Sequence, residues 1–143
     1  MLVKQISVFL ENKSGRLAEV TRILGSRGIN ISALCIADTT DFGILRLIVN
    51  QPENAEQVLK DKGFTVSCTS VVAIGMDDRP GGLSEVLEVL GNAGIGIEYL
   101  YAFIGRKKGY AYVILRMEDP GKAIEVLTLA GVHILSPEDV SDM

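Results

Sequence analysis

The chain is built from one sequence unit that occurs twice. Residues 15–34 align without a gap with residues 81–100, and about half of the aligned positions are identical. A length of 143 residues would by itself suggest a single domain. The repeat is longer than the roughly 20 to 50 residues of solenoid repeats. We therefore expect two small domains, at residues 1–69 and 70–143.

The charge of the chain argues against nucleic acid as a partner. The net charge is −4 at pH 7, whereas a surface that follows phosphates needs clustered lysine and arginine. The one basic run, at residues 106–108, is interpreted as a solvated hairpin turn rather than as a ligand contact.

Cysteine use and the lack of long apolar runs indicate a cytoplasmic protein. Cys35 and Cys68 are far apart and have no metal-ligand spacing, so we expect reduced thiols in the core or on strands. Residues 1–5 lack the build of a signal peptide, and no apolar run reaches the length of a membrane span. We predict no metal, no cofactor and no membrane association.

Hydrophobic spacing in the first copy changes between strand and helix patterns. Residues 4–10 are β-branched and apolar and end at a polar turn, which indicates a strand. Leu17, Val20 and Ile23 recur at helical spacing, and either Gly25 or Gly28 is expected to form a left-handed C-terminal cap. The other predicted elements are strands at residues 29–37 and 43–49, a helix that begins at residue 52, and a strand at residues 64–68.

The second copy repeats this order, so both copies are βαββαβ. Two split βαβ units of this kind form a four-stranded antiparallel sheet with two helices on one face, which predicts two tandem ferredoxin-like domains of the α+β class. Residues 68–70 join strand to strand without a flexible linker, so the domains should be rigidly coupled. The predicted elements are strands at residues 71–76, 95–103, 110–117 and 132–135 and helices at about 81–93 and 121–130.

The strands are apolar on both sides, which predicts a homodimer. Ile97 and Tyr99 should share one side of their strand, yet Leu100 lies on the other side; Leu34 and Ile36 repeat this in the first copy. Helices cover one face of such a sheet, and a second apolar face calls for another buried surface. That surface would be the other copy or a second chain.

No catalytic constellation can be assembled from the sequence, and we expect no enzyme. His133 is the single histidine, and a packed or surface role on its predicted strand is favoured over a general base. The Asp77-Asp78 pair is interpreted as a turn rather than as a metal site. Four tyrosines are interpreted as cross-strand packing at an interface, with a ligand-stacking platform as the alternative: Tyr99, Tyr101, Tyr110 and Tyr112.

The entrances to the first helix of each copy are the candidate binding positions. Ser14-Gly15 and Pro80-Gly81-Gly82 stand where the first four backbone N–H groups of a helix have no intrahelical partner. Glycine lets an anion approach the backbone, and the helix dipole favours negative charge. A carboxylate would fit there, although an ordinary strand-to-helix turn explains the loop residues equally well.

Both loops resemble the signature of the ACT-domain family. Residues 11–17 followed by residues 28–31, and residues 77–83 followed by residues 94–97, look like its two halves. The resemblance covers nearly the whole chain, in tandem. It implies a regulatory protein that binds amino acids or similar small metabolites at interfaces between paired ACT units and addresses a partner, usually a biosynthetic enzyme.

The resemblance distributes the ligand contacts unequally between the copies. Asn12 and Asn30 match positions where amino-acid-binding members use Asn side chains, and an amide both donates and accepts. Their counterparts are Asp78, which would repel a carboxylate, and Gly96, which has no side chain. We therefore expect one ligand per chain, held by the first copy. The candidate ligand-binding residues are Asn12, Ser14, Gly15, Arg16, Leu17, Asn30, Asp78, Pro80, Gly81, Gly82 and Leu83.

The leading hypothesis is a stand-alone tandem ACT protein that senses an amino acid and signals to a partner enzyme or regulator. The alternative is a structural or protein-interaction module whose ligand loops are vestigial. A small enzyme ranks third. An equilibrium binding screen against the amino acids separates the first two hypotheses.

Overall fold

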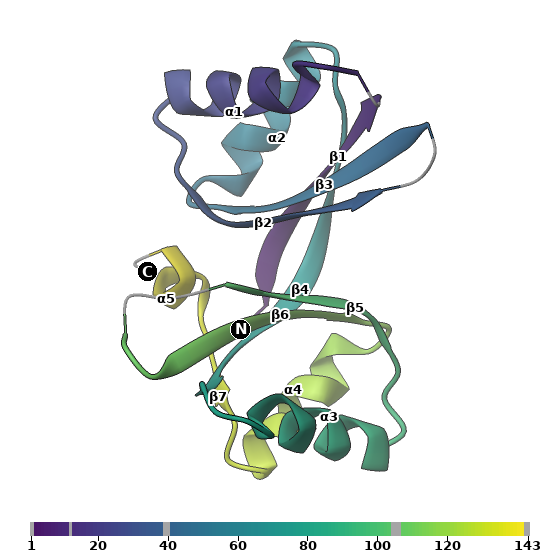
Figure 1. Ribbon diagram of the computed structural model, residues 1–143, viewed down its shortest axis with the longest axis vertical. Helices are drawn as coiled ribbons and strands as arrows, with labels where there is room; N and C mark the ends of the chain where they lie inside the picture. The colour runs from purple at the N-terminus through teal and green to yellow at the C-terminus, as the bar shows by residue number, and fades with distance from the viewer. Residues whose placement is uncertain (1, 12, 39–40, 104–106, 142–143) are drawn as a thin grey trace. The chain divides into compact units, whose positions relative to one another are not determined.

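The computed structural model describes residues 2–11, 13–38, 41–103 and 107–141. The chain forms two compact units, each with its own core (Figure 1). The first unit comprises Lys4–Thr69, and the second comprises Ser70–Met143 together with Met1–Val3.

The first unit has the order βαββαβ. Its last strand continues into the second unit, so one strand ends the first repeat and begins the second. The elements are β1 (Val3–Glu11), α1 (Arg16–Ser26), β2 (Ile31–Asp38), β3 (Phe42–Val49), α2 (Pro52–Asp61) and β4 (Thr65–Asp77).

The second unit repeats the order, starting from the distal part of β4. The two separate strands expected at residues 64–68 and 71–76 form one continuous strand of 13 residues. Residues 65–77 contain neither proline nor a turn sequence, and nothing there interrupts the extended backbone. The further elements are α3 (Gly82–Asn92), β5 (Ile97–Phe103), β6 (Tyr110–Met117), α4 (Pro120–Leu129), β7 (His133–Ile134) and α5 (Pro137–Ser141).

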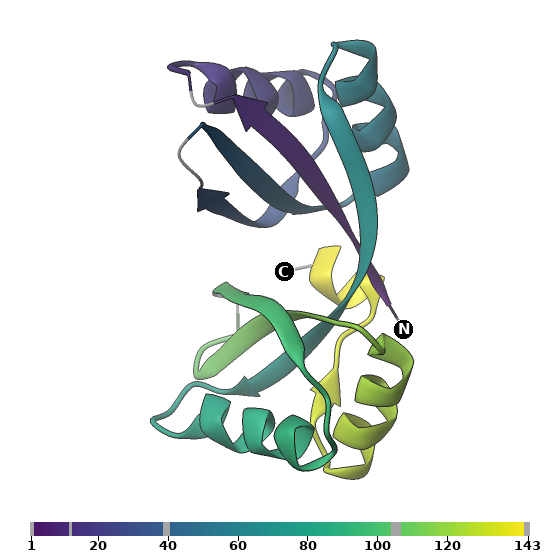
Figure 2. The ribbon, with the colours of Figure 1, turned by 90° about the vertical axis from the view of Figure 1, so that its right-hand side faces the viewer.

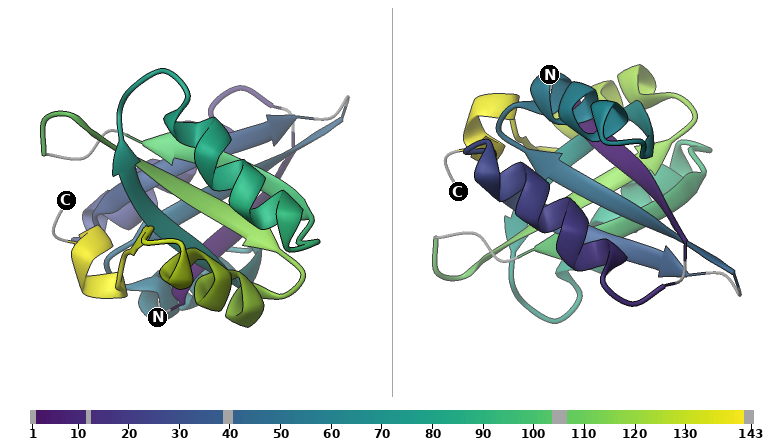
Figure 3. Two further views of the ribbon diagram at one scale, coloured as in Figure 1. Left: turned by 90° about the horizontal axis from the view of Figure 1, so that it is seen from below. Right: turned by 90° about the horizontal axis from the view of Figure 1, so that it is seen from above.

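The strand order is the same in the two units. It is β4-β1-β3-β2 in the first and β7-β4-β6-β5 in the second. The β1–β3, β2–β3, β4–β6, β4–β7 and β5–β6 pairs are antiparallel. In each unit both helices cover one face of the sheet (Figures 2 and 3). This is the ferredoxin-like α+β arrangement predicted from the repeat.

Each core lies between one sheet and its two helices. In α1 the buried residues Val20, Ile23 and Leu24 fall at helical spacing and pack on a cluster that includes Leu45 and Leu47 of β3. The second core has the same construction. It contains Val72, Val86, Leu90, Leu115 and Leu127, each at most 5% exposed.

Glycine ends α1 by a Schellman motif. Gly28 has φ +69°, its N–H donates to the Gly25 carbonyl over 3.1 Å, and the Ile29 N–H donates to the Leu24 carbonyl over 3.0 Å. These two bonds satisfy carbonyls that the helix end would leave open. The cap is therefore Gly28 and not Gly25.

A β-bulge in β5 corrects the expected side-chain directions. Ile97 pairs with Met117, whereas Tyr99 pairs with Arg116, so two residues advance on β5 while one advances on β6. The extra residue reverses the alternation. Ile97 therefore faces the helix-covered core beside Met117, and Tyr99 lies on the opposite face with Arg116.

The C-terminal segment differs from the expected strand. Strand β7 contains only His133 and Ile134. Helix α5 follows it and was not predicted from the sequence. Ser136 and Asp139 form a reciprocal capping box: the Asp139 N–H donates to Ser136 Oγ over 3.1 Å, and the Ser136 N–H donates to Asp139 Oδ2 over 2.9 Å. Among the helices in the described part of the chain, none is long and apolar enough to cross a membrane.

Candidate functional site

The backbone has the same conformation at both helix entrances. Gly15 and Gly81 each have φ +85° at the N-cap position, and neither helix receives a side-chain cap hydrogen bond. The left-handed conformation favours glycine, because it crowds a Cβ atom. The first amide of each helix donates back into the loop, from Arg16 to the Lys13 carbonyl over 3.4 Å and from Gly82 to the Arg79 carbonyl over 3.1 Å. The next amides of the first turn have no intrahelical acceptor, and an anion can bind at such a helix end.

The neighbouring candidate residues surround these entrances. Ser14 and Pro80 are exposed on the loops, Leu17 is 38% exposed, and Leu83 is half-buried and packs against the second core. Asp78 is exposed, and its N–H donates to the Gly109 carbonyl over 2.9 Å. Asn12 lies outside the residues that the structure describes.

Asn30 lies at the other end of α1. This helix has 11 residues, which at 1.5 Å per residue gives about 16 Å between its ends. The sheet register agrees: Glu11 pairs with Phe42 at the start of β3, and Ile31 pairs with Val49 at its end. One small ligand cannot contact both the Gly15 entrance and Asn30 of the same unit.

Two hydrogen bonds join the Asn30 backbone to Asn50, and the equivalent position in the second copy is open. The Asn30 N–H donates to Asn50 Oδ1 over 3.0 Å, and the Asn50 N–H donates to the Asn30 carbonyl over 3.2 Å. The equivalent Gly96 has no positive φ, and a Cβ there would meet nothing within 4 Å. A side chain at Gly96 would therefore begin in open space.

Each entrance carries an arginine paired with an equivalent glutamate. Arg16 Nη1 lies 3.3 Å from Glu19 Oε2, and Arg79 Nη2 lies 2.6 Å from Glu85 Oε2. The hydrogen bond from Arg79, followed by its charge, holds the pKa of Glu85 below its usual value, and the same bond raises the pKa of Arg79. The arginines come from different positions, because Arg16 begins α1 whereas Arg79 precedes α3.

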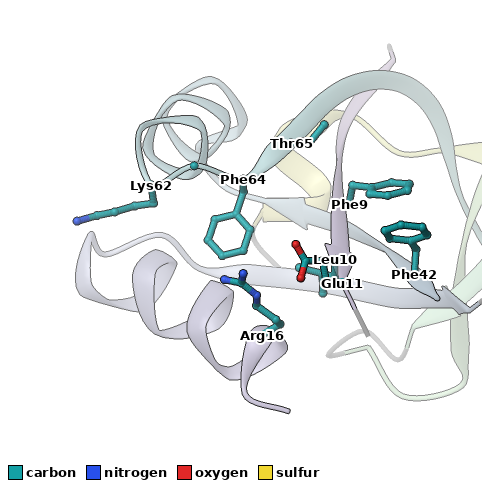
Figure 4. Close-up of a pocket in the computed structure, with 9 residues that line it drawn as sticks. Phe9, Leu10, Glu11, Arg16, Phe42, Lys62, Phe64 and Thr65 are labelled. Carbon is teal, nitrogen blue, oxygen red and sulfur yellow. The ribbon is translucent and has the colours of Figure 1, made fainter. Parts of the chain in front are cut away.

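A cavity of about 160 Å³ lies beside the α1 entrance (Figure 4). The Arg16 guanidinium faces the Phe64 ring at 5.9 Å from its centroid, and Phe9 and Phe42 pack at 4.8 Å between centroids. Among the residues that line the cavity, only Arg16 was predicted from the sequence to bind a ligand. The aromatic residues were missed because they are contributed by β1, β3 and the turn after α2, which are far apart in the sequence.

The other residues considered in the sequence analysis are one histidine and two cysteines. His133 is exposed and pairs with Gly75 in the sheet. Cys35 and Cys68 are free thiols on β2 and β4, and Cys68 is exposed, so the core is excluded for it. Burial raises the pKa of the half-buried Cys35 thiol. Within the described ranges, no group of three or more His, Cys, Asp or Glu residues could hold a metal ion.

The phenylalanine–tyrosine contact on the second sheet supports cross-strand packing. Phe103 and Tyr112 are direct partners across β5 and β6, and their rings stack at 5.5 Å between centroids. Lys107 Nζ lies 4.3 Å from the centroid of Tyr110. The tyrosines on β6 thus have intramolecular partners within their own unit.

The chain thus consists of two ferredoxin-like units in tandem, and each first helix begins after a glycine with φ +85°. The family model that describes an ACT domain pair matches residues 1–143. The chain belongs to the ACT domain pair family.

Similar proteins agree with this fold. A crystal structure of protein BT0572 from Bacteroides thetaiotaomicron is 47% identical, covers 100% of this chain and 98% of that chain, and has a TM-score of 0.94. The ligand-free regulatory subunit of aspartate kinase from Thermus thermophilus is 17% identical over 90% of this chain and 93% of that chain, with a TM-score of 0.66, and shows a similar fold.

One curated relative matches part of the chain. The acetolactate synthase small subunit of Buchnera aphidicola subsp. Schizaphis graminum is 27% identical over 77 residues, which are 52% of this chain. The match spans 49% of that relative, about half its length. The aspartate kinase protein is named as a regulatory subunit, and the acetolactate synthase protein as a small subunit.

Proposed function

We propose that this protein is an amino-acid sensor that passes its ligand state to a partner enzyme or regulator. The observation that carries the proposal is the conformation shared by Gly15 and Gly81, beyond which the second and third amides of α1 and α3 have no intrahelical acceptor and suit a carboxylate. The family and the regulatory subunit among its structural neighbours support a regulatory rather than a catalytic role. A cytoplasmic location and the absence of a cofactor remain part of the proposal.

The proposed form is a homodimer. A ligand that touches both the Gly15 entrance and Asn30 would need the second group from another chain, since about 16 Å separates the two ends of α1 within one unit. Leu34 and Ile36 of β2 are 49% and 47% exposed. In the described part of the sheet β2 pairs only with β3, so a second chain has a free strand edge to join.

A calorimetric screen against the twenty amino acids tests the sensor. Binding of at least one amino acid is expected. If the first copy holds the ligand through Asn30, Asn30→Ala should weaken binding by about 1 to 3 kcal/mol, the cost of leaving a polar partner unpaired. Circular dichroism of the variant controls for folding. The absence of binding to every amino acid would contradict the sensor and favour the alternative, an interaction module with vestigial loops.

Sedimentation velocity at micromolar concentration tests the dimer. The wild-type chain should sediment as a dimer, and Leu34→Lys should shift it toward the monomer, because a charge on the strand edge opposes pairing. Leu129→Lys is the matched control, since Leu129 is 84% exposed at the end of α4. A monomeric wild-type protein would contradict this part of the proposal.

A further inference from the structure

The second unit has a cavity at the position equivalent to the one beside α1. Both are lined by the end of the first strand, the first helix, the start of the third strand and the turn after the second helix. The cavity of the first unit has a volume of about 160 Å³, and that of the second about 360 Å³. Pockets that hold small molecules measure roughly 300 to 1,000 Å³, so only the second reaches this range.

The backbones around the two cavities match. Gly63 and Gly131 have φ +89° and +81°, and each follows the second helix of its unit. The next residue closes the same Schellman bond in both: the Phe64 N–H donates to Leu59 over 3.1 Å, and the Val132 N–H donates to Leu127 over 3.0 Å. Phe64 and Val132 therefore occupy equivalent backbone positions after the second helix of their units.

Side chains account for the difference in volume. In the first unit the Arg16 guanidinium lies over the Phe64 ring, and both residues line the cavity and narrow it (Figure 4). The equivalent residues of the second unit are Gly82 and Val132, which are much smaller. Gly75 likewise replaces Phe9 on the adjoining strand.

The opening at Gly82 is fixed by the backbone. A Cβ atom at this position would lie 2.7 Å from the Asp77 carbonyl oxygen and 3.0 Å from Met76 Cε. Real Cβ contacts are not that short, so a larger residue requires the loop to move. The glycine that widens the cavity is also required by the packing of the α3 entrance.

The lining combines an apolar wall with charges of both signs at the rim. Met76, Val89 and Val132 provide the apolar wall. The Arg79–Glu85 ion pair lies at the rim, with both side chains about half-exposed and close to the start of α3. Arginine can hold a carboxylate through two parallel N–H groups, and a glutamate can accept from an ammonium group.

We propose that the cavity of the second unit binds an aliphatic α-amino acid, with the carboxylate on Arg79, the ammonium group on Glu85, and the side chain against Met76, Val89 and Val132. This inference rests on the proposed sensor function and assigns its ligand to the second copy, whereas the asparagine pattern of the sequence favours the first. Tyr110 and His133 complete the wall on the side of the sheet.

The test is isothermal titration calorimetry of the full chain with valine, leucine and isoleucine. Val132→Phe introduces the residue type that occupies the first cavity, and it should weaken binding by about tenfold or more because it fills the space. Arg79→Gln alters an exposed side chain and should weaken binding about 10- to 100-fold by removing a charged hydrogen bond. Leu129→Phe adds the same ring on the exposed end of α4 and should leave the affinity unchanged.

The outcomes separate the cavity from the sensor function. Binding that survives both Val132→Phe and Arg79→Gln, in proteins with wild-type circular dichroism, overturns the cavity and leaves the sensor in place. If Asn30→Ala loses binding while Val132→Phe and Arg79→Gln keep it, the cavity is likewise overturned and the sensor function stays in place. If none of the twenty amino acids binds the wild-type chain, the sensor function and the cavity fall together. If Val132→Phe fails to fold, Arg79→Gln decides.

Discussion

The two copies have the same backbone plan, and their sites differ through a few side chains. Gly15 and Gly81 cap their helices with the same φ of +85°, and both units have the strand order of a ferredoxin-like fold. The difference lies at the cavity. Arg16 and Phe64 line it in the first unit, and their counterparts in the second unit are Gly82 and Val132. The same fold thus carries different side chains at one position, and the two copies have cavities of unequal volume as a result.

The largest effects are expected where the copies are most alike. Leu24 and Leu90 occupy equivalent core positions, and both are fully buried. Leu24→Ala and Leu90→Ala should each cost about 2 to 5 kcal/mol of unfolding free energy, since each leaves a cavity in a packed core. Urea titration followed by circular dichroism measures the loss. A cost below 1 kcal/mol at either position would break the equivalence of the two cores, and Leu129→Ala is the exposed control.

Smaller and unequal effects are expected at the first helical residue. Gly82→Ala should destabilise the chain by about 1 to 3 kcal/mol, because its Cβ atom would meet the Asp77 carbonyl at 2.7 Å. Arg16→Ala places the same side chain at the equivalent position of the first unit, where the arginine already has a Cβ atom, and should change stability by about 0.5 kcal/mol or less. Equal costs at the two positions would contradict the argument that packing fixes the glycine.

Ligand binding can be used to compare Asn30 with the equivalent position of the second copy, Gly96. Gly96→Asn restores in the second copy the side chain that Asn30 supplies in the first, and the open space there should accept it without loss of stability. If asparagine recognition decides affinity, the titration should gain a second site per chain. An unchanged isotherm would show that the cavity outweighs the asparagine, and Gly96→Ala controls for the change in backbone freedom.

The smallest expected effect is a pH dependence at the α3 entrance. The pKa of Glu85 is lowered in the folded protein by its hydrogen bond from Arg79. Its contribution to stability is therefore present above the unfolded pKa near 4.5 and is lost as the pH falls through the lower folded value. Glu85→Gln should lower the melting temperature slightly at pH 7, and the difference should shrink below pH 4. A difference that grows on acidification would contradict the ion pair.

The repeat was sufficient to predict the fold, because hydrophobic spacing and glycine positions are local signals. Gly28 and Gly94 close the same helix ends, and the core residues of α1 fall at helical spacing. The bulge in β5 was not predicted, since it depends on pairing with β6 rather than on the sequence of β5 itself. The continuity of β4 was missed because each half reads as a strand of normal length.

The candidate site was predictable only where it consists of consecutive residues. The loops around Gly15 and Gly81 could be identified from the sequence, whereas the cavities bring together residues from four separate elements. That Phe64 and Val132 line equivalent cavities is recognised only when the turns after α2 and α4 are compared in three dimensions. A signal was nevertheless available, because the turn after the second helix carries an aromatic residue in one copy and a small one in the other.

The stoichiometry of amino-acid binding tests the inequality of the two copies most directly. Calorimetric titration of the wild-type chain should give one molecule per chain, because only the second unit has a cavity of about 360 Å³, while Arg16 and Phe64 lie in the first. The Val132→Phe chain should then give no saturable heat at the same concentrations. Two equal sites per chain in the wild-type protein would contradict the account.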